Sequence, residues 1–275
     1  MMAAPRREQR EEVVDAVLQS RRYKNVAPDL VRRLAGEELP KSKNAADAQK
    51  RTKRRLHQIF GAYADPLPYD KLIDKLQDAH ADPEQFKRIC KEILPLHAST
   101  AERMKDLDRF YKPIFEITGR PAKIMDLACG LNPLTIPWMG LSPSTFYLAT
   151  DIDTELVKFL DRFLAIAPVH GEARANDLVA GPPGDDATIS FLFKALPCLQ
   201  HQVPDLLPIL DEINANWLVI SFPTRSLGGR SGKGMIATYR QMMQQLVNQR
   251  QWPAEEVAFS SEIVFVVRKN AAPVG

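Results

Sequence analysis

The spacing of hydrophobic residues changes near residue 120 of this chain. Before that point, apolar side chains recur every three or four residues, as in Leu30-Val31-Leu34 and Leu56-Ile59-Phe60, which predicts amphipathic helices. After it, short apolar runs alternate with helical stretches. The apolar runs predict buried strands over residues 123–128, 145–150, 189–193, 217–222 and 263–267. The stretches between them predict helices over residues 154–166, 204–213 and 235–250.

This alternation indicates an α/β fold, in which a mostly parallel sheet carries helices on both faces. The last two runs, 255–259 and 262–267, are separated by Ser260-Ser261 and predict an antiparallel hairpin at the sheet edge. We therefore expect a helical domain over residues 1–118 and an α/β domain over residues 119–275.

The composition is that of an ordinary globular protein, with 275 residues of which 45% are hydrophobic and 26% charged. No run of eighteen apolar residues occurs, and the basic N-terminus lacks the apolar segment of a secretory signal. The cysteines Cys90, Cys129 and Cys198 lack the spacing of a disulfide framework or a metal site. These features predict a cytoplasmic protein with no membrane partner, no disulfide and no metal.

Positive charge is concentrated at the N-terminus. Residues 1–60 hold 15 Lys and Arg against 8 Asp and Glu, whereas the remaining residues hold 22 against 26. Such asymmetry is typical of a protein with a polyanionic partner. Basic helices are also common as solvated surfaces, and charge alone leaves both interpretations open.

An acidic residue follows each of three successive elements of the predicted sheet. Asp126 opens a tight, glycine-containing turn, Asp151 comes about twenty residues later, and Asp177 follows the third element. In an open α/β sheet, ligands bind at the carboxyl ends of the strands, and an acid after the second strand can accept hydrogen bonds from a ribose. The first turn lacks Gly-x-Gly-x-x-Gly, and Asn132-Pro133 disfavours a helix start for a pyrophosphate, so S-adenosylmethionine is favoured over NAD. The alternative is that these acids are ordinary caps at strand ends, which is the more frequent role of any one of them taken singly.

Several segments together resemble the 16S rRNA guanine-N7 methyltransferases that confer aminoglycoside resistance. The resemblance covers roughly residues 10–268 and is carried by DLACGLNP at 126–133, ATDID at 149–153, KALPCL at 194–199, SFPTRSL at 221–227, HASTAER at 97–103 and KRTKRRLHQIFGA at 50–62. It implies a Rossmann-like, S-adenosylmethionine-dependent methyltransferase sheet with a helical N-terminal domain that recognises rRNA.

The resemblance also assigns roles to matching positions. Asp126 and Gly130 are expected at the methionine part of the cofactor, Asp151 at the ribose hydroxyls, and Asp177 with Leu178 at the adenine. The remaining cofactor-binding positions are His97, Arg103, Ala128 and Ile152. Arg103 is expected to grip the methionine carboxylate, because a guanidinium can bind a carboxylate through two bonds. An ion pair of Arg103 with Asp106 or Asp108 on its own helix is the alternative.

A basic, glycine-rich segment follows the strand predicted at 217–222. Residues 221–240 contain no acidic residue, and glycines stand at 228, 229, 232 and 234. Such a segment suits contacts with RNA phosphates, and arginine can stack on an unstacked base. The expected catalytic positions are Lys194, Arg225, Arg230 and Met235, and the expected RNA contacts are Arg21, Arg22, Lys24, Lys53, Arg54, Lys233 and Tyr239. Arg32-Arg33 and Lys50-Arg51 are further basic pairs of the helical half. A solvated loop is the alternative for the glycine-rich segment.

The expected activity is methyl transfer from S-adenosylmethionine to N7 of a guanine in the decoding site of 16S rRNA, with S-adenosylhomocysteine as product. The expected partner is the assembled small ribosomal subunit, bound by a monomer that binds no DNA. Guanine N7 carries a lone pair and no proton, so no general base is required, and the site has to extract and aim the base. Two alternatives stay open: a methyltransferase for another rRNA position, such as adenine N1, and a catalytically silent RNA-binding protein.

Overall fold

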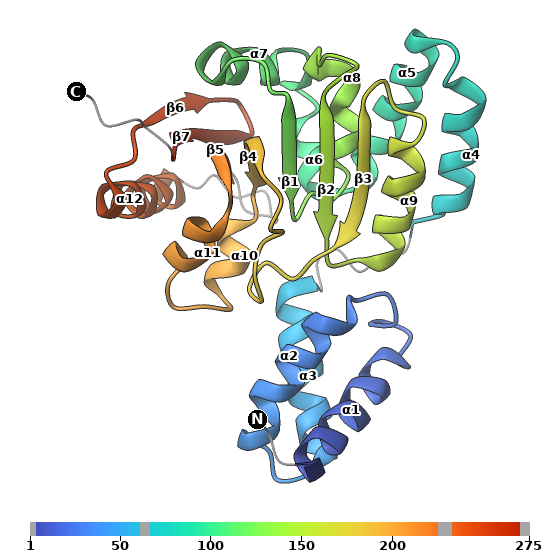
Figure 1. Cartoon of the computed structure of the whole chain (residues 1–275), viewed down its shortest axis with the longest axis vertical. Coiled ribbons are helices and arrows are strands. Elements are labelled where there is room, and N and C mark those ends of the chain that lie inside the picture. Colours follow the sequence, from blue (N-terminus) through green and yellow to red (C-terminus); the bar gives the residue numbers. More distant parts are fainter. Residues whose placement is uncertain (1–3, 61–66, 225–232, 270–275) are drawn as a thin grey trace.

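The computed structural model describes residues 4–60, 67–224 and 233–269 of the chain. Its centre is a seven-stranded sheet with the order β3-β2-β1-β4-β5-β7-β6 (Figure 1). The strands are β1 Lys123–Leu127, β2 Phe146–Asp151, β3 His170–Ala175, β4 Ala187–Phe193, β5 Ala215–Pro223, β6 Ala254–Ala258 and β7 Glu262–Arg268. Neighbours from β3 to β5 pair in parallel, whereas β7 pairs antiparallel with both β5 and β6. The predicted α/β sheet and its terminal hairpin are thus confirmed.

The strand β3 was not predicted as a hydrophobic run, because its sequence His-Gly-Glu-Ala-Arg-Ala is mostly polar. It lies at the sheet edge and pairs only with β2 among the described strands. An edge strand is covered less completely than a central one and tolerates polar side chains on both faces. Its half-exposed pattern contrasts with the buried residues of β1 and β4.

Helices cover both faces of the sheet, as the alternating pattern predicted. One face carries α4 Tyr69–Ala79, α5 Pro83–Ile93, α7 Leu107–Thr118 and α9 Thr154–Leu164, and the other carries α10 Leu196–Gln200, α11 Leu207–Glu212 and α12 Lys233–Arg250. Two further helices, α6 Ala98–Arg103 and α8 Ile136–Met139, are short. Single 3-10 turns lie at Leu39–Lys41, Leu94–Leu96 and Asn132–Thr135. Among the described helices, none is long and apolar enough to cross a membrane.

The first three helices form a lobe with a hydrophobic core of its own. These are α1 Ala4–Leu18, α2 Pro28–Glu38 and α3 Ala45–Phe60, and Figure 1 shows them beyond the carboxyl ends of β1–β3. We call residues 4–60 the N-terminal lobe. By contrast, Leu72, Phe86 and Phe110 of the later helices belong to the core of the sheet. Helices α4–α7 thus pack on the sheet, whereas the predicted boundary at residue 118 assigns them to the helical domain.

Candidate functional site

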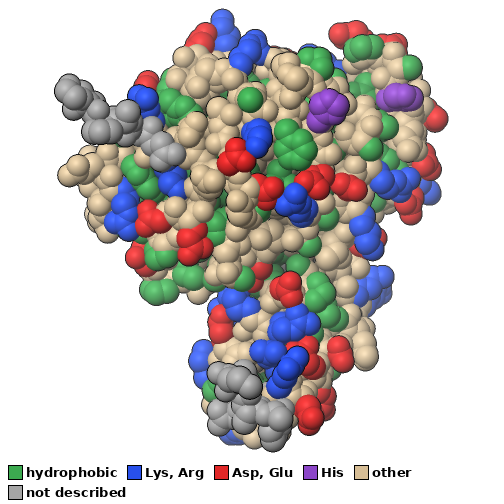
Figure 2. Space-filling view, viewed as in Figure 1, with side chains coloured by type: hydrophobic (Ala, Val, Ile, Leu, Met, Phe, Trp, Pro, Cys, Tyr) green, Lys and Arg blue, Asp and Glu red, His purple; other side chains and the backbone are tan. Residues whose placement is uncertain are grey.

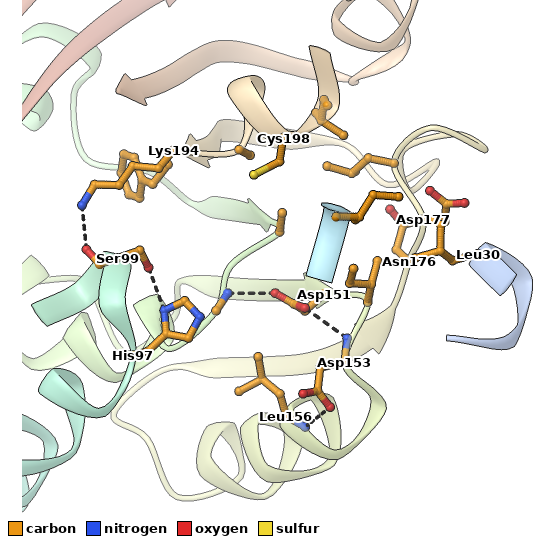
Figure 3. Close-up of a pocket in the computed structure, with 18 of the residues that line it drawn as sticks. Leu30, His97, Ser99, Asp151, Asp153, Leu156, Asn176, Asp177, Lys194 and Cys198 are labelled. Atoms are coloured by element: carbon orange, nitrogen blue, oxygen red, sulfur yellow. Dashed lines mark hydrogen bonds between the residues drawn. The ribbon is translucent and has the colours of Figure 1, made fainter. Parts of the chain in front are cut away.

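A pocket opens at the carboxyl ends of the parallel strands, where sheet and N-terminal lobe meet (Figure 3). Its lining includes seven of the expected cofactor-binding residues, namely His97, Ala128, Gly130, Asp151, Ile152, Asp177 and Leu178, and also the expected catalytic residue Lys194. The sequence did not point to the remaining lining residues, which are Leu30, Ile59, Tyr69, Ser99, Asp153, Leu156, Asn176, Phe193, Ala195, Cys198, Leu199 and Gln202. Side chains from distant segments of the chain therefore converge on one cavity.

The turns after β1 and β2 are joined to each other. Gly130 donates its backbone N–H to Oδ2 of Asp151 at 2.9 Å, and Asp153 donates its backbone N–H to Oδ1 at 3.1 Å. Gly130 has φ +52°, and a Cβ at this position would lie 2.8 Å from Cε1 of His97. Glycine therefore allows this turn to approach the imidazole closely, and the backbone of the turn forms one side of the pocket.

The imidazole of His97 is held beside the pocket by its neighbours on the chain. Its Nδ1 lies 2.8 Å from Oγ of Ser99, and burial lowers the pKa of His97. The sequence of residues 99–102 has the form of a capping box with Ser99 as the cap, but the structure contradicts that interpretation. Helix α6 begins at Ala98 with no side-chain cap, because Ser99 contacts His97 while Glu102 pairs with Lys194.

Asp126 lies behind the first turn and is completely buried. Its Oδ2 accepts hydrogen bonds from the Tyr147 hydroxyl at 2.6 Å and the Asn132 amide at 2.8 Å. Its Oδ1 has no hydrogen-bond partner among the described residues. Burial raises the pKa of Asp126 to about 7, although the bonds from Tyr147 and Asn132 oppose this shift. A buried acceptor without a partner suits a ligand that brings a donor, such as the ammonium group of a methionine.

Arg103 forms a buried ion pair that neither sequence alternative anticipated. Its Nε and Nη2 donate to the two carboxylate oxygens of Glu262 at 2.7 and 2.9 Å, and Asn132 accepts from Nη1. The guanidinium also lies over the rings of Phe110 and Phe193. Asp106 pairs with Arg109 instead. Arg103 is not among the residues that line the pocket, and its contact with a methionine carboxylate stays a prediction.

Lys194 follows β4 and is oriented by protein groups at the pocket wall. Its Nζ donates to the carbonyl of Ser99 at 2.8 Å (Figure 3). The same Nζ pairs with Glu102 at 2.7 Å. The residue is 9% exposed and adopts φ +59°, which is uncommon for a residue with a side chain. Lys194 is therefore not a surface lysine that extends its ammonium group into solvent, which is the ordinary alternative for a lysine at the end of a strand.

Asp177 is bound by an arginine of the N-terminal lobe. Arg33 donates from Nε to Oδ2 at 2.7 Å and from Nη2 to Oδ1 at 3.1 Å. Arg32, the neighbouring residue, pairs with Glu11 and Asp29. Neither arginine therefore offers an unengaged guanidinium to RNA, contrary to the general expectation for basic residues of this half. Each arginine also has a partner on its own helix, since Arg32 pairs with Asp29 and Arg33 with Glu37. Only the pairing of Arg33 with Asp177, 144 positions away, left no local signal in the sequence.

The other cations of the N-terminal lobe include ion-paired residues and the residues expected to contact RNA. Arg51 and Arg55 pair with the carboxylates of Glu37 and Glu38, so they are neutralised at the lobe's surface. The expected RNA contacts Arg21, Arg22, Lys24 and Arg54 are exposed, and Lys53 is half-buried. Figure 2 shows Lys and Arg side chains interspersed with Asp and Glu over this lobe.

The expected substrate contacts near α12 are only partly described. Arg225 and Arg230 lie outside the described residues, and α12 begins at Lys233. Met235 is half-buried, while Tyr239 stacks on Phe222 with ring centroids 4.5 Å apart. One face of the Tyr239 ring is thus used in core packing. Arg240, the last residue of the basic, glycine-rich segment, pairs with Glu256 of β6, although no acidic residue stands near Arg240 in the sequence.

The strand order, the glycine turn after β1 and the carboxylate after β2 define a Rossmann-like methyltransferase that binds S-adenosylmethionine. Residues 19–266 match the family described as "Ribosomal RNA methyltransferase (FmrO)". The chain belongs to this family of ribosomal RNA methyltransferases, which confirms the sequence-based assignment.

Curated relatives and solved structures agree with this assignment. The 16S rRNA (guanine(1405)-N(7))-methyltransferase of Micromonospora rosea is 39% identical, over 94% of this chain and 96% of its own. The enzyme of the same name from Serratia marcescens is 30% identical, over 94% and 98%. The crystal structure of the 16S rRNA methyltransferase RmtF with S-adenosyl-L-homocysteine has 30% identity and a TM-score of 0.77, with 96% of this chain and 99% of RmtF covered.

Proposed function

We propose that this enzyme transfers a methyl group from S-adenosylmethionine to N7 of a guanine in the decoding site of 16S rRNA, within the assembled small ribosomal subunit. The names of the relatives support the base and the atom. The observation that carries the proposal is the contact between the two parts of the chain: a basic lobe forms one wall of a pocket that suits an adenosine-containing methyl donor.

The described residues fit S-adenosylmethionine in three places. Asp126 is buried and is not among the residues that line the pocket, but its Oδ1 has no hydrogen-bond partner among the described residues, so we assign this oxygen to the amino group of the methionine part. Asp151 lines the pocket and offers carboxylate oxygens to the ribose hydroxyls. Asp177 and Leu178 lie at the far end of the pocket, where they would bind the adenine by its amino group and its face. The cofactor supplies an electrophilic sulfonium methyl group.

The protein's part in the reaction is positioning. When the N7 lone pair forms its bond to the methyl carbon, the sulfur–carbon bond breaks and its electron pair stays on sulfur. The guanine ring gains the positive charge that the sulfonium loses, and no proton moves. Cations are therefore expected at RNA phosphates or the O6 edge rather than against N7. We assign this role to Lys194, Arg225 and Arg230, with Met235 beside the extracted base.

Recognition of the subunit is assigned to the basic residues Arg21, Arg22, Lys24, Lys53 and Arg54 of the N-terminal lobe, with Lys233 and Tyr239 nearer the reacting base. Their charge suits the phosphate backbone of a folded RNA, which is recognised largely by shape. We also propose that the enzyme acts as a monomer. Aminoglycoside resistance follows if the methylated guanine belongs to the drug-binding site.

The test is methylation of purified small ribosomal subunits by the purified enzyme with S-adenosylmethionine. Methylated positions are mapped by mass spectrometry of 16S rRNA fragments. We expect one N7-methylated guanine in the decoding site, and resistance to aminoglycosides in a susceptible bacterium that produces the enzyme. A methylated adenine would instead support the adenine N1 alternative, and cofactor binding without any methylation would contradict the proposed activity.

A further inference from the structure

The N-terminal lobe is attached directly to the loop that carries Asp151. Ala27 donates its backbone N–H to the carbonyl of Ile152, and Thr154 donates its backbone N–H to the carbonyl of Asn25, both at 2.8 Å. An isolated antiparallel bridge pairs Val26 with Asp153. The chain that leads into α2 therefore lies along the rim of the cofactor pocket as a short extra strand.

From this rim, α2 reaches the other side of the pocket through Arg33. Besides its two bonds to Asp177, Arg33 donates from Nη2 to Oε1 of Gln202 at 2.9 Å. Burial would lower the pKa of Arg33, but the hydrogen bond and charge of Asp177 raise it. Asp177 is only 6% exposed. A planar guanidinium that binds both oxygens of a carboxylate fixes its rotation as well as its place.

The bonds leave Asp177 with a defined free acceptor position. Its Oδ1 accepts from Arg33 Nη2 and from the backbone N–H of Val179. Among the described residues, Oδ2 accepts only from Arg33 Nε. A carboxylate oxygen has two lone pairs, so Oδ2 keeps one for a further donor. The same helix places Leu30 in the pocket lining, and α3 adds Ile59. The lobe thus orients the acceptor and covers the cavity beside it.

We propose that Arg33 is a positioning residue for adenine recognition. Because Arg33 belongs to the N-terminal lobe and fixes the Asp177 carboxylate, recognition of the adenine 6-amino group depends on the docking of this lobe against the α/β domain. This inference rests on the proposed contact of Asp177 with the adenine. By thermodynamic linkage, a cofactor that binds more tightly when α2 is docked also stabilises the docked lobe. The lobe that is proposed to bind rRNA is then best ordered when methyl donor is present.

The test measures binding of S-adenosylhomocysteine, and of S-inosylhomocysteine, to the full-length enzyme by calorimetry. The inosyl analogue carries an oxygen where adenine carries its 6-amino group. We expect Arg33→Gln to weaken S-adenosylhomocysteine binding by about tenfold and to reduce the preference over the inosyl analogue. The matched control is Arg32→Gln on the same helix. Its partners Glu11 and Asp29 are not among the residues that line the pocket, so this change should alter the affinity less than about twofold.

Asp177→Asn separates this inference from the proposed function. If that variant keeps both affinity and preference, the adenine role of Asp177 is wrong. If it loses them while Arg33→Gln binds as wild type, the adenine role holds and the positioning role of Arg33 is overturned. In the double variant, Arg33→Gln should add no further loss, because Arg33 acts through Asp177. Should Arg33→Gln fail to fold, Arg33→Lys keeps the charge without the two-point grip, and an unchanged preference there would also overturn the inference.

Discussion

Gly130 and Asp151 are joined by a 2.9 Å hydrogen bond from the backbone N–H of the glycine to Oδ2 of the carboxylate. The bond connects the turn after β1 with the turn after β2, and both belong to the pocket. Asp151 therefore supports the wall of the site in addition to offering acceptors to a ribose. Its replacement is expected to change cofactor binding through both effects.

We predict that Asp151→Ala weakens S-adenosylhomocysteine binding by about 1–3 kcal/mol, because ribose donors lose a charged acceptor and the Gly130 N–H loses its partner. Calorimetry at constant pH measures the change. Asp151→Asn is the control, since its amide oxygen can still accept from Gly130, and a smaller loss is expected. Unchanged affinity in a folded Asp151→Ala variant would contradict the ribose assignment.

The close approach of Gly130 to His97 gives a second prediction. Gly130→Ala places a methyl group about where the imidazole lies and keeps φ in the left-handed region, so we expect a loss of about 1–2 kcal/mol in folding stability and weaker cofactor binding. Thermal denaturation and calorimetry measure the two losses. Combining it with His97→Ala removes the clash but not the backbone strain, so part of the stability should return. No recovery in the double variant would show that the imidazole is not the obstacle.

The shifted pKa of Asp126 predicts a pH-dependent affinity for the cofactor. Burial raises this pKa to about 7, so at pH 6 most molecules carry a neutral carboxyl group that has to lose its proton to bind an ammonium group. Affinity is then expected to rise about fivefold between pH 6 and pH 7 and about tenfold between pH 6 and pH 8, and to level off above pH 8, with proton release on binding. Calorimetry in buffers of different ionisation enthalpy detects the proton. A flat profile from pH 6 to pH 8 would disprove the contact, and Asp126→Asn should abolish the slope.

The same shift affects folding without ligand. The pKa of Asp126 in the folded chain lies above the ordinary value of 3.8 for an aspartate, so the folded state holds the proton more tightly than the unfolded state does. The free energy of unfolding should therefore fall as the pH rises from about 4 to about 7. Denaturant titrations of wild type and Asp126→Asn isolate this contribution, because the variant has no carboxyl group to titrate.

The N-terminal lobe, which ends with α3, has a core of its own, whereas α4 and the later helices belong to the core of the sheet. This division changes the result that we expect when the chain is shortened from its N-terminus. The sequence-based boundary predicts that a chain beginning near residue 95 still folds and binds cofactor weakly. That chain lacks Leu72, Ile73, Leu76, Phe86 and Ile93 of the sheet's core. Since one large buried side chain contributes about 2–5 kcal/mol, we expect the shortened chain not to fold.

A chain that begins at residue 67 keeps α4 and α5 and is expected to fold, but without Leu30, Arg33 and Ile59 it should bind cofactor more weakly than the full chain. Circular dichroism and calorimetry on both shortened chains decide between the two boundaries. Folding of the chain that begins near residue 95 would restore the boundary at residue 118.

The basic, glycine-rich segment supplies a prediction from the sequence alone, because Arg230 lies outside the described residues. Arg230→Glu and Lys233→Glu should each keep the wild-type melting temperature and cofactor affinity but lose methylation of small subunits. Removal of one phosphate contact should also reduce the log–log salt dependence of subunit binding by about one. Normal methylation by both variants at equal concentration would show that the segment is only a connector.

The sequence predicted the elements whose cause is local. A buried parallel strand reveals itself as an apolar run, and the carboxyl ends of such strands meet at one edge, so the grouping of Asp151 and Asp177 could be inferred from order along the chain. The polar edge strand β3 escaped because it lacks the buried surface that produces the pattern. The capping box failed because Ser99 and Glu102 found partners outside the first turn of α6.

Pairings between remote charges were decided only by the tertiary structure. Arg103 with Glu262 and Arg33 with Asp177 join residues more than a hundred positions apart, and nothing local selects one carboxylate among many. Such a choice depends on which groups are brought together away from water, where an unpaired charge is costly. The class of protein and the edge of the sheet that binds the cofactor therefore follow from the sequence, because both depend on a local pattern in which each strand is followed by a turn with an acidic residue. The wall that the N-terminal lobe adds to the pocket follows only from the packing of one core against another.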